Sequence, residues 1–343
     1  MIKVGLIGCG RISERHFEVF KELKDKLQLI AVCDKIKSRA DKYAEKFNVK
    51  SYENYEEMLD KEKFDMMSIC TPSGFHPKHG IMAAKKKINV LTEKPMAVTL
   101  EGANELIKEC DDNNVKLFVV KQNRLNPPIQ LLKKAIEKNR FGKIYMTNAT
   151  VFWQRPQEYY DMADWRGKWE FDGGAFMNQA SHYVDMIQWL IGPVDYVTAI
   201  TGTLARNIET EDTGAALLKF RSGAIGIIQV TMLVYPKNYE GSITILGEKG
   251  TVKIGGTAVN KIEKWEFEKY DDDDSKIAEI NYVIKSVYGF GHKGYYMNVI
   301  DVLKRNGKAE TDGREGKKSI ELILAIYKSA KIGAIVPLPL GKD

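Results

Sequence analysis

The chain has 343 residues, of which 44% are apolar and 29% are charged, and its formal net charge is +6. This length predicts two domains, each large enough to bury a core. The positive charge is modest and spread along the chain, so it does not indicate a nucleic-acid partner, although it suits an anionic small substrate. No apolar run is long enough to span a membrane, and the four cysteines show no metal spacing. Because the first predicted strand starts at residue 2, leaving no room for a signal peptide, we expect a cytoplasmic protein with reduced thiols and no metal.

The start of the chain combines a short apolar run with closely spaced glycines. Residues 2–7 predict a buried strand, Gly8 and Gly10 follow, and an amphipathic helix begins near Ser13. Gly8 permits a tight turn, and Gly10 lets the backbone approach a pyrophosphate beside the free N–H groups of the helix start. Ser13 stands where a dinucleotide motif prefers Gly or Ala, but it is small enough for close packing. The pattern favours a dinucleotide site, although a tight turn in any α/β protein is the alternative for such a motif alone.

Asp34 ends the next predicted strand, residues 27–33. A carboxylate at this place accepts hydrogen bonds from the adenosine ribose hydroxyls and repels a 2′-phosphate, so the sequence favours NAD over NADP. Lys35, Lys37 and Arg39 could serve a 2′-phosphate, but an exposed basic helix start is the simpler interpretation.

Strands and helices go on alternating to about residue 120. Strands are predicted over residues 64–70, 88–92 and 116–120, and helices over 77–87 and 100–110. Such alternation predicts a parallel sheet with right-handed crossovers, in which ligands bind at the carboxyl ends of the strands. The residues at these ends include Gly8, Thr71, Pro72, Glu93, Lys94, Gln122 and Asn123. We therefore expect residues 1–124 to form a Rossmann-type NAD-binding domain.

The remaining residues, 125–343, are expected to form a second domain around an open, mostly antiparallel sheet. A linking helix is predicted near residues 126–139, and one helix over about 175–190 interrupts the strands. Those strands are predicted over residues 144–153, 196–204, 214–220, 225–233, 242–246 and 251–254. Asp271–Asp274 is most simply a solvated loop. The apolar alternation of Ile225–Val230 predicts that the second sheet face is also covered, by another subunit, and we expect a tetramer.

Two side chains are suited to proton transfer. Lys94 follows a strand and precedes Pro95, which keeps it out of helical geometry and gives its side chain a defined direction. His182 lies on the interrupting helix, and its ordinary pKa suits a general base. For either residue alone, a surface lysine or a packed histidine is the ordinary interpretation. The other histidines show no ligand spacing, so a zinc dehydrogenase is not expected; they are His16, His76, His79 and His292.

Glu93-Lys94-Pro95, Gly173-Gly174 and His182 together resemble the glucose–fructose oxidoreductase/inositol dehydrogenase family, and the resemblance covers the whole chain. It implies an active site between a Rossmann domain and an open-sheet domain, with catalytic roles for Lys94, His182 and Asn178. Many members carry Asp where this chain has Asn178, so the chain departs from the family at the position through which a proton would be relayed. The expected NAD-binding residues are Gly8, Gly10, Arg11, Ile12, Asp34, Thr71, Pro72, His76, Glu93, Lys94 and Gln122.

Longer segments, such as residues 152–160 and 171–179, are similar to one subgroup of this family. Its members oxidise the C3′ hydroxyl of UDP-N-acetylglucosaminuronate, a UDP-sugar acid on the route to diacetamido-uronic acids of bacterial surface polysaccharides. Some relatives recycle NADH with 2-oxoglutarate, and the sequence does not decide that point. The expected substrate-binding residues are Lys94, Asn123, Arg155, Tyr159, Tyr160, Arg166, Asn178, Ser181, His182, Tyr235 and Lys237.

The residue types in the sequence suit the expected UDP-sugar acid. A diphosphate and a carboxylate need several cations, and uracil needs an aromatic surface; short clusters around residues 153–166 and 235–237 supply both. Two alternatives stay open. A dehydrogenase of a neutral cyclitol or free sugar would not need the cationic clusters. A non-catalytic NAD-binding sensor would not need Lys94 and His182 together.

Overall fold

The computed structural model describes residues 1–283 and 291–341, which form two compact units. Unit 1 combines residues 1–121 with 292–317, and unit 2 combines residues 122–291 with 318–343. The chain thus leaves unit 1 close to the expected boundary after residue 124, but it returns there late. The return brings helix α10 (Gly291–Arg305) into unit 1, where its buried Tyr295 donates a hydrogen bond to the Val119 carbonyl oxygen at 2.6 Å. No sequence pattern indicated this return, because it depends on packing between distant segments.

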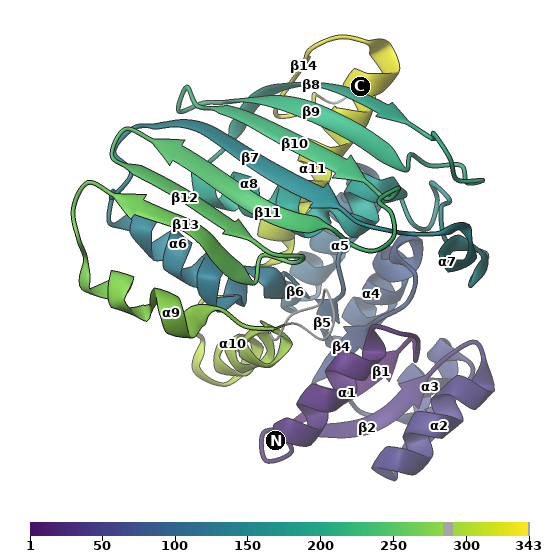
Figure 1. The fold of residues 1–343 in the computed structure, drawn as a ribbon. Coiled ribbons are helices and arrows are strands. Elements are labelled where there is room, and N and C mark those ends of the chain that lie inside the picture. The colour runs from purple at the N-terminus through teal and green to yellow at the C-terminus, as the bar shows by residue number, and fades with distance from the viewer. Residues whose placement is uncertain (284–290, 342–343) are drawn as a thin grey trace. The chain divides into compact units, whose positions relative to one another are not determined.

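Unit 1 is built on a six-stranded parallel sheet with the order β3-β2-β1-β4-β5-β6, drawn in purple and blue in Figure 1. Its strands are β1 (Ile2–Ile7), β2 (Leu27–Cys33), β3 (Lys50–Tyr52), β4 (Met66–Ile69), β5 (Asn89–Thr92) and β6 (Leu117–Val119). The strand order reverses between β1 and β4, and ligands bind outside the carboxyl ends of the strands at such a reversal. The predicted Rossmann sheet is confirmed. Strand β3 was not predicted, because three residues are too few to show a pattern.

The helices of unit 1 cross between these strands. They are α1 (Ser13–Glu22), α2 (Lys37–Phe47), α3 (Tyr55–Lys61), α4 (His76–Lys85), α5 (Leu100–Asp112) and α10, with a short 3₁₀ turn η1 (Ser73–Phe75). Local capping explains where some of them begin. The Thr99 hydroxyl accepts the Gly102 N–H at the start of α5. At the start of α3, the side-chain oxygen of Asn54 accepts the Glu57 N–H. Helix α1 has no side-chain cap, so its first turn keeps N–H groups for another acceptor.

Unit 2 contains an eight-stranded sheet with the order β13-β12-β11-β7-β10-β9-β8-β14. Its strands are β7 (Ile144–Phe152), β8 (Val194–Gly202), β9 (Thr213–Phe220), β10 (Ile225–Thr231), β11 (Glu240–Gly247), β12 (Gly250–Gly255), β13 (Lys261–Phe267) and β14 (Val336–Pro337). Neighbours pair antiparallel, except that β7 and β10 are parallel. The expected open, mostly antiparallel sheet is confirmed. Strand β13 was not predicted, because a register shift in its pairing with β12 interrupts the alternation of its apolar residues, Ile262, Trp265 and Phe267.

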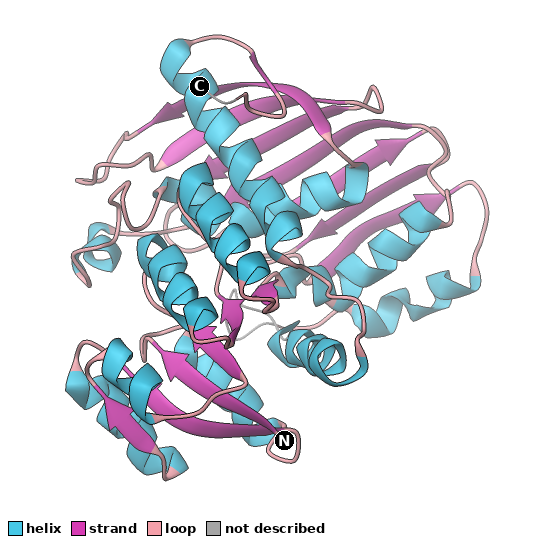
Figure 2. Cartoon of the chain, turned by 180° about the vertical axis from the view of Figure 1, so that it is seen from behind, coloured by secondary structure: helices cyan, strands magenta, loops and turns pink. Residues whose placement is uncertain are grey.

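Helices cover one face of this sheet, as the view from behind in Figure 2 shows. The helical segments of unit 2 are η2 (Gln122–Leu125), α6 (Pro127–Glu137), α7 (Gln157–Asp161), η3 (Ala175–Gln179), α8 (Ser181–Ile191), η4 (Asp272–Lys276), α9 (Ile277–Ile280) and most of α11 (Gly313–Ile332). Over the described residues, no helix of the chain is long and apolar enough to cross a membrane.

The opposite face of the same sheet, turned to the viewer in Figure 1, carries exposed apolar side chains. Ile200, Leu217 and Ile225 are 81%, 51% and 49% exposed. The strand register places them on one face, because Leu217 pairs with Ile227 and Ala215 pairs with Ile200. Alternate residues such as Ile228 point to the helix-covered side and are buried.

The expectation of a solvated loop at Asp271–Asp274 is wrong. The segment forms η4, and Asp273 is only 6% exposed. Lys134 of α6 donates a hydrogen bond to Asp273 at 2.8 Å, and Arg140 donates to Asp274 at 2.6 Å. A run of acidic residues is usually solvated, but here the basic residues at the end of α6 pair with it. Their distance in sequence concealed that pairing.

Candidate active site

The two glycines of the first turn serve different purposes. Gly8 has φ +93°, and a Cβ there would lie 2.6 Å from the Cys70 carbonyl carbon, so the fold itself requires glycine. A Cβ at Gly10 would meet no atom within 4 Å. The packing of the described chain therefore does not explain Gly10. Open space over a backbone that carries no side chain is what the approach of a pyrophosphate requires.

The helix start and Asp34 complete this part of unit 1. The Ser13 hydroxyl donates to the Gly10 carbonyl oxygen at 2.6 Å and thereby braces the turn. The Asp34 carboxylate is 8% exposed and accepts the N–H groups of Cys9 at 2.7 Å and Ile36 at 2.8 Å. These bonds fix the carboxylate at the carboxyl end of β2. Each oxygen has a second lone pair, so the group can still accept ribose hydroxyls.

The other residues predicted around this turn are more exposed to solvent. Arg11 is exposed and Ile12 is half-buried. Lys35, Lys37 and Arg39 are exposed, and Lys37 pairs with Asp41 of its own helix. The simpler interpretation of these basic residues, a solvated helix start, agrees with this placement.

His76 ties two of the predicted strand ends together. Its side chain is buried, and its ring nitrogens lie 2.7 Å from the carbonyl oxygens of Thr71 and Pro95. Burial lowers its pKa. Thr71 and Pro72 follow β4, and Pro95 follows Lys94 through a cis peptide bond. A neutral imidazole has one N–H, so His76 donates to one of these two carbonyl oxygens and thereby fixes one of the turns.

Glu93 is the centre of a buried hydrogen-bonded cluster directly before Lys94. Its Oε1 accepts hydrogen bonds from Nε2 of His16 at 3.0 Å and of His292 at 3.3 Å, and its Oε2 accepts the Lys94 N–H at 3.2 Å. His16 also contacts the Tyr296 hydroxyl at 2.7 Å. Burial alone would raise the pKa of Glu93, but the two histidines hold it well below its usual value. Burial lowers the pKa of His16. The cluster fixes the backbone from which Lys94 projects.

Sequence spacing did not indicate this cluster, because its histidines come from opposite ends of the chain. His16, Glu93 and His292 are of the types that bind zinc, and their ligand atoms lie within 4.8 Å of one another. The fold therefore brings His16 and His292 together although their spacing in sequence shows no ligand pattern. In the structure, hydrogen bonds to Glu93 hold the group together.

Buried amides without partners follow the end of β6, in unit 2. Gln122 is fully buried and Asn123 is 2% exposed. Within the described residues, neither side-chain amide atom of Gln122 has a hydrogen-bond partner, and Oδ1 of Asn123 has none. The neighbouring Arg124 is held by two bonds to Asp185, at 2.7 and 2.8 Å. Buried polar atoms without partners are costly, so these amides are suited to hydrogen-bond a bound group.

A cluster of arginine and aromatic side chains gathers several of the predicted substrate residues. The Arg166 guanidinium lies 4.2 Å and the Arg155 guanidinium 5.3 Å from the Tyr159 ring centre. Gln179 accepts a hydrogen bond from Arg155 at 2.9 Å and donates one to the Tyr159 hydroxyl at 3.0 Å. Tyr160 packs edge-on against Tyr159, and burial raises its pKa. The cluster therefore presents two guanidinium groups on an aromatic surface, which suits a nucleotide diphosphate.

Tyr235 and Lys237 lie on the loop between β10 and β11, and both are exposed, Tyr235 by 90%. The structure does not bring their side chains into the packed cluster. The same loop is tethered to it by Asn238, whose Oδ1 accepts the Gln154 N–H at 2.9 Å and a hydrogen bond from Arg155 at 3.2 Å.

The single helix predicted over residues 175–190 is divided in the structure. A π-helical turn, η3, carries Asn178, and α8 begins at Ser181. The Ser181 hydroxyl donates to the Asn178 carbonyl oxygen at 3.4 Å. His182 lies in the first turn of α8 and is 7% exposed. π-Helical turns are frequent at functional sites, and this one separates Asn178 from His182 by an irregular backbone.

Glu211 holds the start of this turn. Its Oε1 accepts the Phe176 N–H at 2.8 Å and the Tyr327 hydroxyl at 2.9 Å. Gly174 has φ +89°, a conformation that favours glycine, and a Cβ there would collide with the Glu211 carboxylate. Burial raises the pKa of Glu211 to about 8, so its carboxyl group is mostly protonated at neutral pH. Glu211 and Tyr327 were not predicted, since nothing near them in sequence marks the contact.

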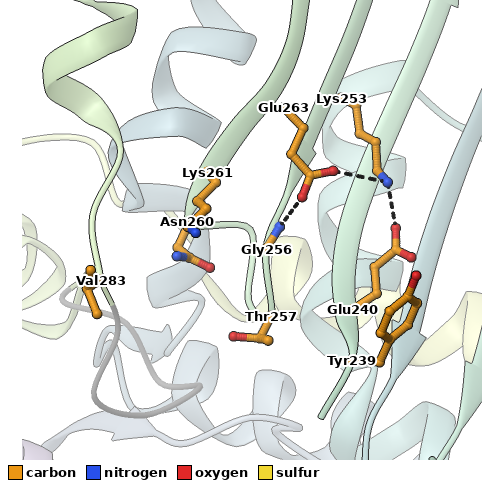
Figure 3. Close-up of a pocket in the computed structure, with 9 residues that line it drawn as sticks. All are labelled: Tyr239, Glu240, Lys253, Gly256, Thr257, Asn260, Lys261, Glu263 and Val283. Carbon is orange, nitrogen blue, oxygen red and sulfur yellow. Dashed lines mark hydrogen bonds and ion pairs between the residues drawn. The ribbon is translucent and has the colours of Figure 1, made fainter.

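A separate pocket of about 390 Å³ lies beside β11, β12 and β13 (Figure 3). Lys253 there pairs with Glu240 at 2.9 Å and Glu263 at 3.1 Å. Its lining contains none of the predicted site residues; it consists of Tyr239, Glu240, Lys253, Gly256, Thr257, Asn260, Lys261, Glu263 and Val283. Because its charges largely pair with one another, this pocket does not add to the site.

Comparison with known proteins covers both units. Residues 2–121 match the NAD-binding Rossmann fold of an oxidoreductase family, and residues 133–338 match the C-terminal alpha/beta domain of that family. The chain is similar to the WlbA dehydrogenase from Bordetella pertussis, solved with NADH and UDP-GlcNAcA, at 53% identity and a TM-score of 0.96 over 99% of this chain and 98% of that one. The WlbA dehydrogenase from Chromobacterium violaceum, solved with the same two ligands, is 51% identical with a TM-score of 0.95, over 99% of this chain and 97% of that one. Myo-inositol 2-dehydrogenase from Thermotoga maritima is 25% identical over 337 residues, 96% of each chain.

Proposed function

Because the chain belongs to the glucose–fructose oxidoreductase/inositol dehydrogenase family of NAD-binding oxidoreductases, we propose that it oxidises the C3′ hydroxyl of UDP-N-acetylglucosaminuronate with NAD. The observation that carries the substrate class is the cluster of Arg155, Tyr159 and Arg166, which offers two cations on an aromatic surface. Two solved dehydrogenases more than half identical to this chain hold NADH and UDP-GlcNAcA, which supports the same ligands here.

The residues of unit 1 fit NAD. The open space over Gly10 and the uncapped first turn of α1 suit the pyrophosphate, and Asp34 suits an unphosphorylated ribose. Gln122, whose buried amide has no hydrogen-bond partner among the described residues, is placed at the same cofactor in this proposal. When bound, NAD supplies the acceptor for a hydride at its nicotinamide ring.

The proposed chemistry divides between Lys94 and His182. The sugar hydroxyl is too weak an acid to ionise unaided near neutral pH, so a base within hydrogen-bond reach must take its proton as the hydride leaves C3′. His182 is assigned as that base, because the ordinary histidine pKa is close to neutrality. Lys94 donates a hydrogen bond to the C3′ oxygen and stabilises the charge that develops on it. Asn178 is the third residue of the proposed catalytic group and acts as a positioning group beside the reacting carbon.

The rest of the substrate is assigned to unit 2. Arg155 and Arg166 bind the diphosphate, with Tyr159 beneath them and Tyr160 supporting it. Asn123 in η2 and Ser181 at the start of α8 are buried residues that offer further polar atoms to the substrate. Tyr235 and Lys237 stand on the exposed loop, where they can reach the nucleotide end of a long substrate.

We also propose a homotetramer. The sheet of unit 2 has one face without a helix of the described chain, and that face exposes Ile200, Leu217 and Ile225. Contiguous apolar surface of this kind marks an interaction site, and a second copy of the chain is the simplest cover. Light scattering at micromolar concentration checks the assembly; a monomer contradicts it.

The test of the function is incubation with UDP-N-acetylglucosaminuronate and NAD, with and without 2-oxoglutarate, and with each component omitted in turn. The expected result is a 3-keto sugar nucleotide, formed with NADH in the absence of 2-oxoglutarate. Sustained turnover without net NADH would identify 2-oxoglutarate as the reoxidant. Oxidation of a neutral cyclitol or free sugar, with no response to the UDP-sugar acid, would overturn the proposed substrate. NAD binding without turnover on any substrate would indicate a sensor.

A further inference from the structure

Asp172 is a buried carboxylate that the mechanism above does not use. It is 3% exposed and directly precedes the glycine pair at residues 173–174. Its Oδ2 accepts the Gly167 N–H at 2.8 Å, and its own N–H donates to the Lys168 carbonyl oxygen at 2.8 Å. Both the backbone and the side chain of Asp172 are therefore fixed by the loop before η3 begins.

The other oxygen of Asp172 accepts a hydrogen bond from the side-chain amide of Asn178. Since a carboxylate only accepts hydrogen bonds, the amide must turn its nitrogen toward Asp172. The nitrogen and oxygen of an amide lie on opposite branches of a planar group, so Oδ1 of Asn178 faces the other way. The reverse orientation would set the amide oxygen against a carboxylate oxygen, and two acceptors cannot form a hydrogen bond with each other.

We propose that Asp172 is a positioning residue, which holds Asn178 with its carbonyl oxygen toward the reacting sugar. Position 178 then acts as a fixed hydrogen-bond acceptor and carries no proton. This inference rests on the proposed function, because it takes Asn178 to lie at the reacting carbon with Lys94 and His182. It leaves His182 as the group that takes the hydroxyl proton.

The same contact explains why Asn suits position 178 in this chain. An Asp there would face Asp172, and two carboxylates at hydrogen-bond distance in a buried place cannot both ionise without a large cost. The Asn178 amide, which faces the substrate, and the Asp172 carboxylate, on the other side of that amide, therefore form a matched donor and acceptor pair. Exchanging the two residues keeps one hydrogen bond between them with the donor and acceptor reversed.

The experiment uses that exchange in the full-length chain. The variants are Asp172→Asn, Asn178→Asp and the double exchange Asp172→Asn/Asn178→Asp, with Asp164→Asn as a control at an exposed carboxylate of the same segment. Each single change is expected to lower kcat roughly 10-fold or more, because the fixed acceptor is lost or a second buried carboxyl group is introduced. KM for NAD should stay unchanged. The double exchange should recover most of the loss of Asn178→Asp, and the control should match wild type.

Two outcomes in the kinetics overturn the inference: wild-type kcat in Asp172→Asn, or a double exchange whose loss is the product of the two single losses. Melting temperatures identify variants that do not fold. A second readout needs no substrate. The side-chain amide signal of Asn178, assigned by its loss in Asn178→Asp and observed after labelling of asparagine with ¹⁵N, should shift in Asp172→Asn and stay in place in Asp164→Asn.

This second readout separates the two proposals. If wild type does not oxidise the UDP-sugar acid, the proposed function fails, and the amide signal alone decides the contact between Asp172 and Asn178. An Asn178 signal that Asp172→Asn leaves unmoved overturns the positioning role, whatever the substrate.

Discussion

Unit 1 and unit 2 build their parts of the candidate site in opposite ways. In unit 1, backbone groups at strand ends form most of the site, at Gly8, Gly10 and the start of α1. In unit 2, side chains from separate segments assemble the site, as when Gln179 joins Arg155 to Tyr159. A backbone site is specified by a local motif, whereas a side-chain site depends on how distant segments pack. The two parts should therefore respond differently to substitution.

The largest expected effect comes from removing one reactive group from each unit. Lys94→Ala and His182→Ala should each lower turnover by roughly 10²-fold or more, the range typical of a general base or an oxyanion partner. Turnover with the UDP-sugar acid at saturating NAD measures this. NAD binding, followed by fluorescence titration, should survive both changes, because the phosphate turn, which contains neither residue, supplies most of the binding even though Lys94 lies near the cofactor. Near-normal turnover in both variants would show that the chemistry lies elsewhere.

The two glycines provide a matched pair within unit 1. Gly10→Ala should weaken NAD binding by about 10-fold while leaving the melting temperature near that of wild type, because the new methyl group meets no protein atom. Gly8→Ala should lower the free energy of unfolding by on the order of 1–3 kcal/mol, since its φ is +93° and the methyl group would approach Cys70. Equal destabilisation by both changes would contradict the distinction.

Asp34 tests whether a side chain in unit 1 adds selectivity to the backbone site. Asp34→Ala should bring the dissociation constants of NAD and NADP closer together, by several-fold, because the carboxylate no longer repels a 2′-phosphate. Calorimetric titration with each nucleotide measures the change. If the wild-type protein already binds both nucleotides equally, the role assigned to Asp34 is wrong.

The smallest effect on the reaction at neutral pH is expected at Glu211, and it appears mainly in stability. Burial raises the folded pKa of this carboxyl group from 4.5 to about 8, so the unfolded chain loses the proton first. Its contribution to stability is complete below pH 4.5 and is lost as pH rises through about 8. Glu211→Gln should flatten the fall in melting temperature over that range. Parallel curves for wild type and variant would contradict the raised pKa.

The sequence predicts unit 1 well because its information is local. Alternating apolar runs define the parallel strands, and Gly8 and Gly10 mark the turn where the glycine requirement is strongest. In unit 2 the strands β7 to β12 were predicted, but β13, β14 and the interruption between η3 and α8 were not. Periodicity continues smoothly through residues 175–190, and Glu211, which holds the start of η3, lies far from it in sequence.

The missed residues share a physical reason. Asp172 lies beside Asn178 only because a loop turns back between them, and Glu211 arrives from a different segment altogether. The cluster of His16, Glu93 and His292 is assembled from three distant places. For Asp172 alone the sequence held a sign, its position directly before two glycines. For the others, only the folded chain shows the contact.

The late return of the chain to unit 1 has a consequence for how the protein is made. Tyr295 and Tyr296 are fully buried among residues of the N-terminal sheet and α1, yet nearly all of unit 2 is synthesised before them. Nascent domains generally fold in the order in which they leave the ribosome. Here the first unit to emerge must wait for residues 292–317 before His16 and the Val119 carbonyl gain these partners. A polypeptide released early would therefore carry an unfinished N-terminal core, which proteases can distinguish from the complete enzyme.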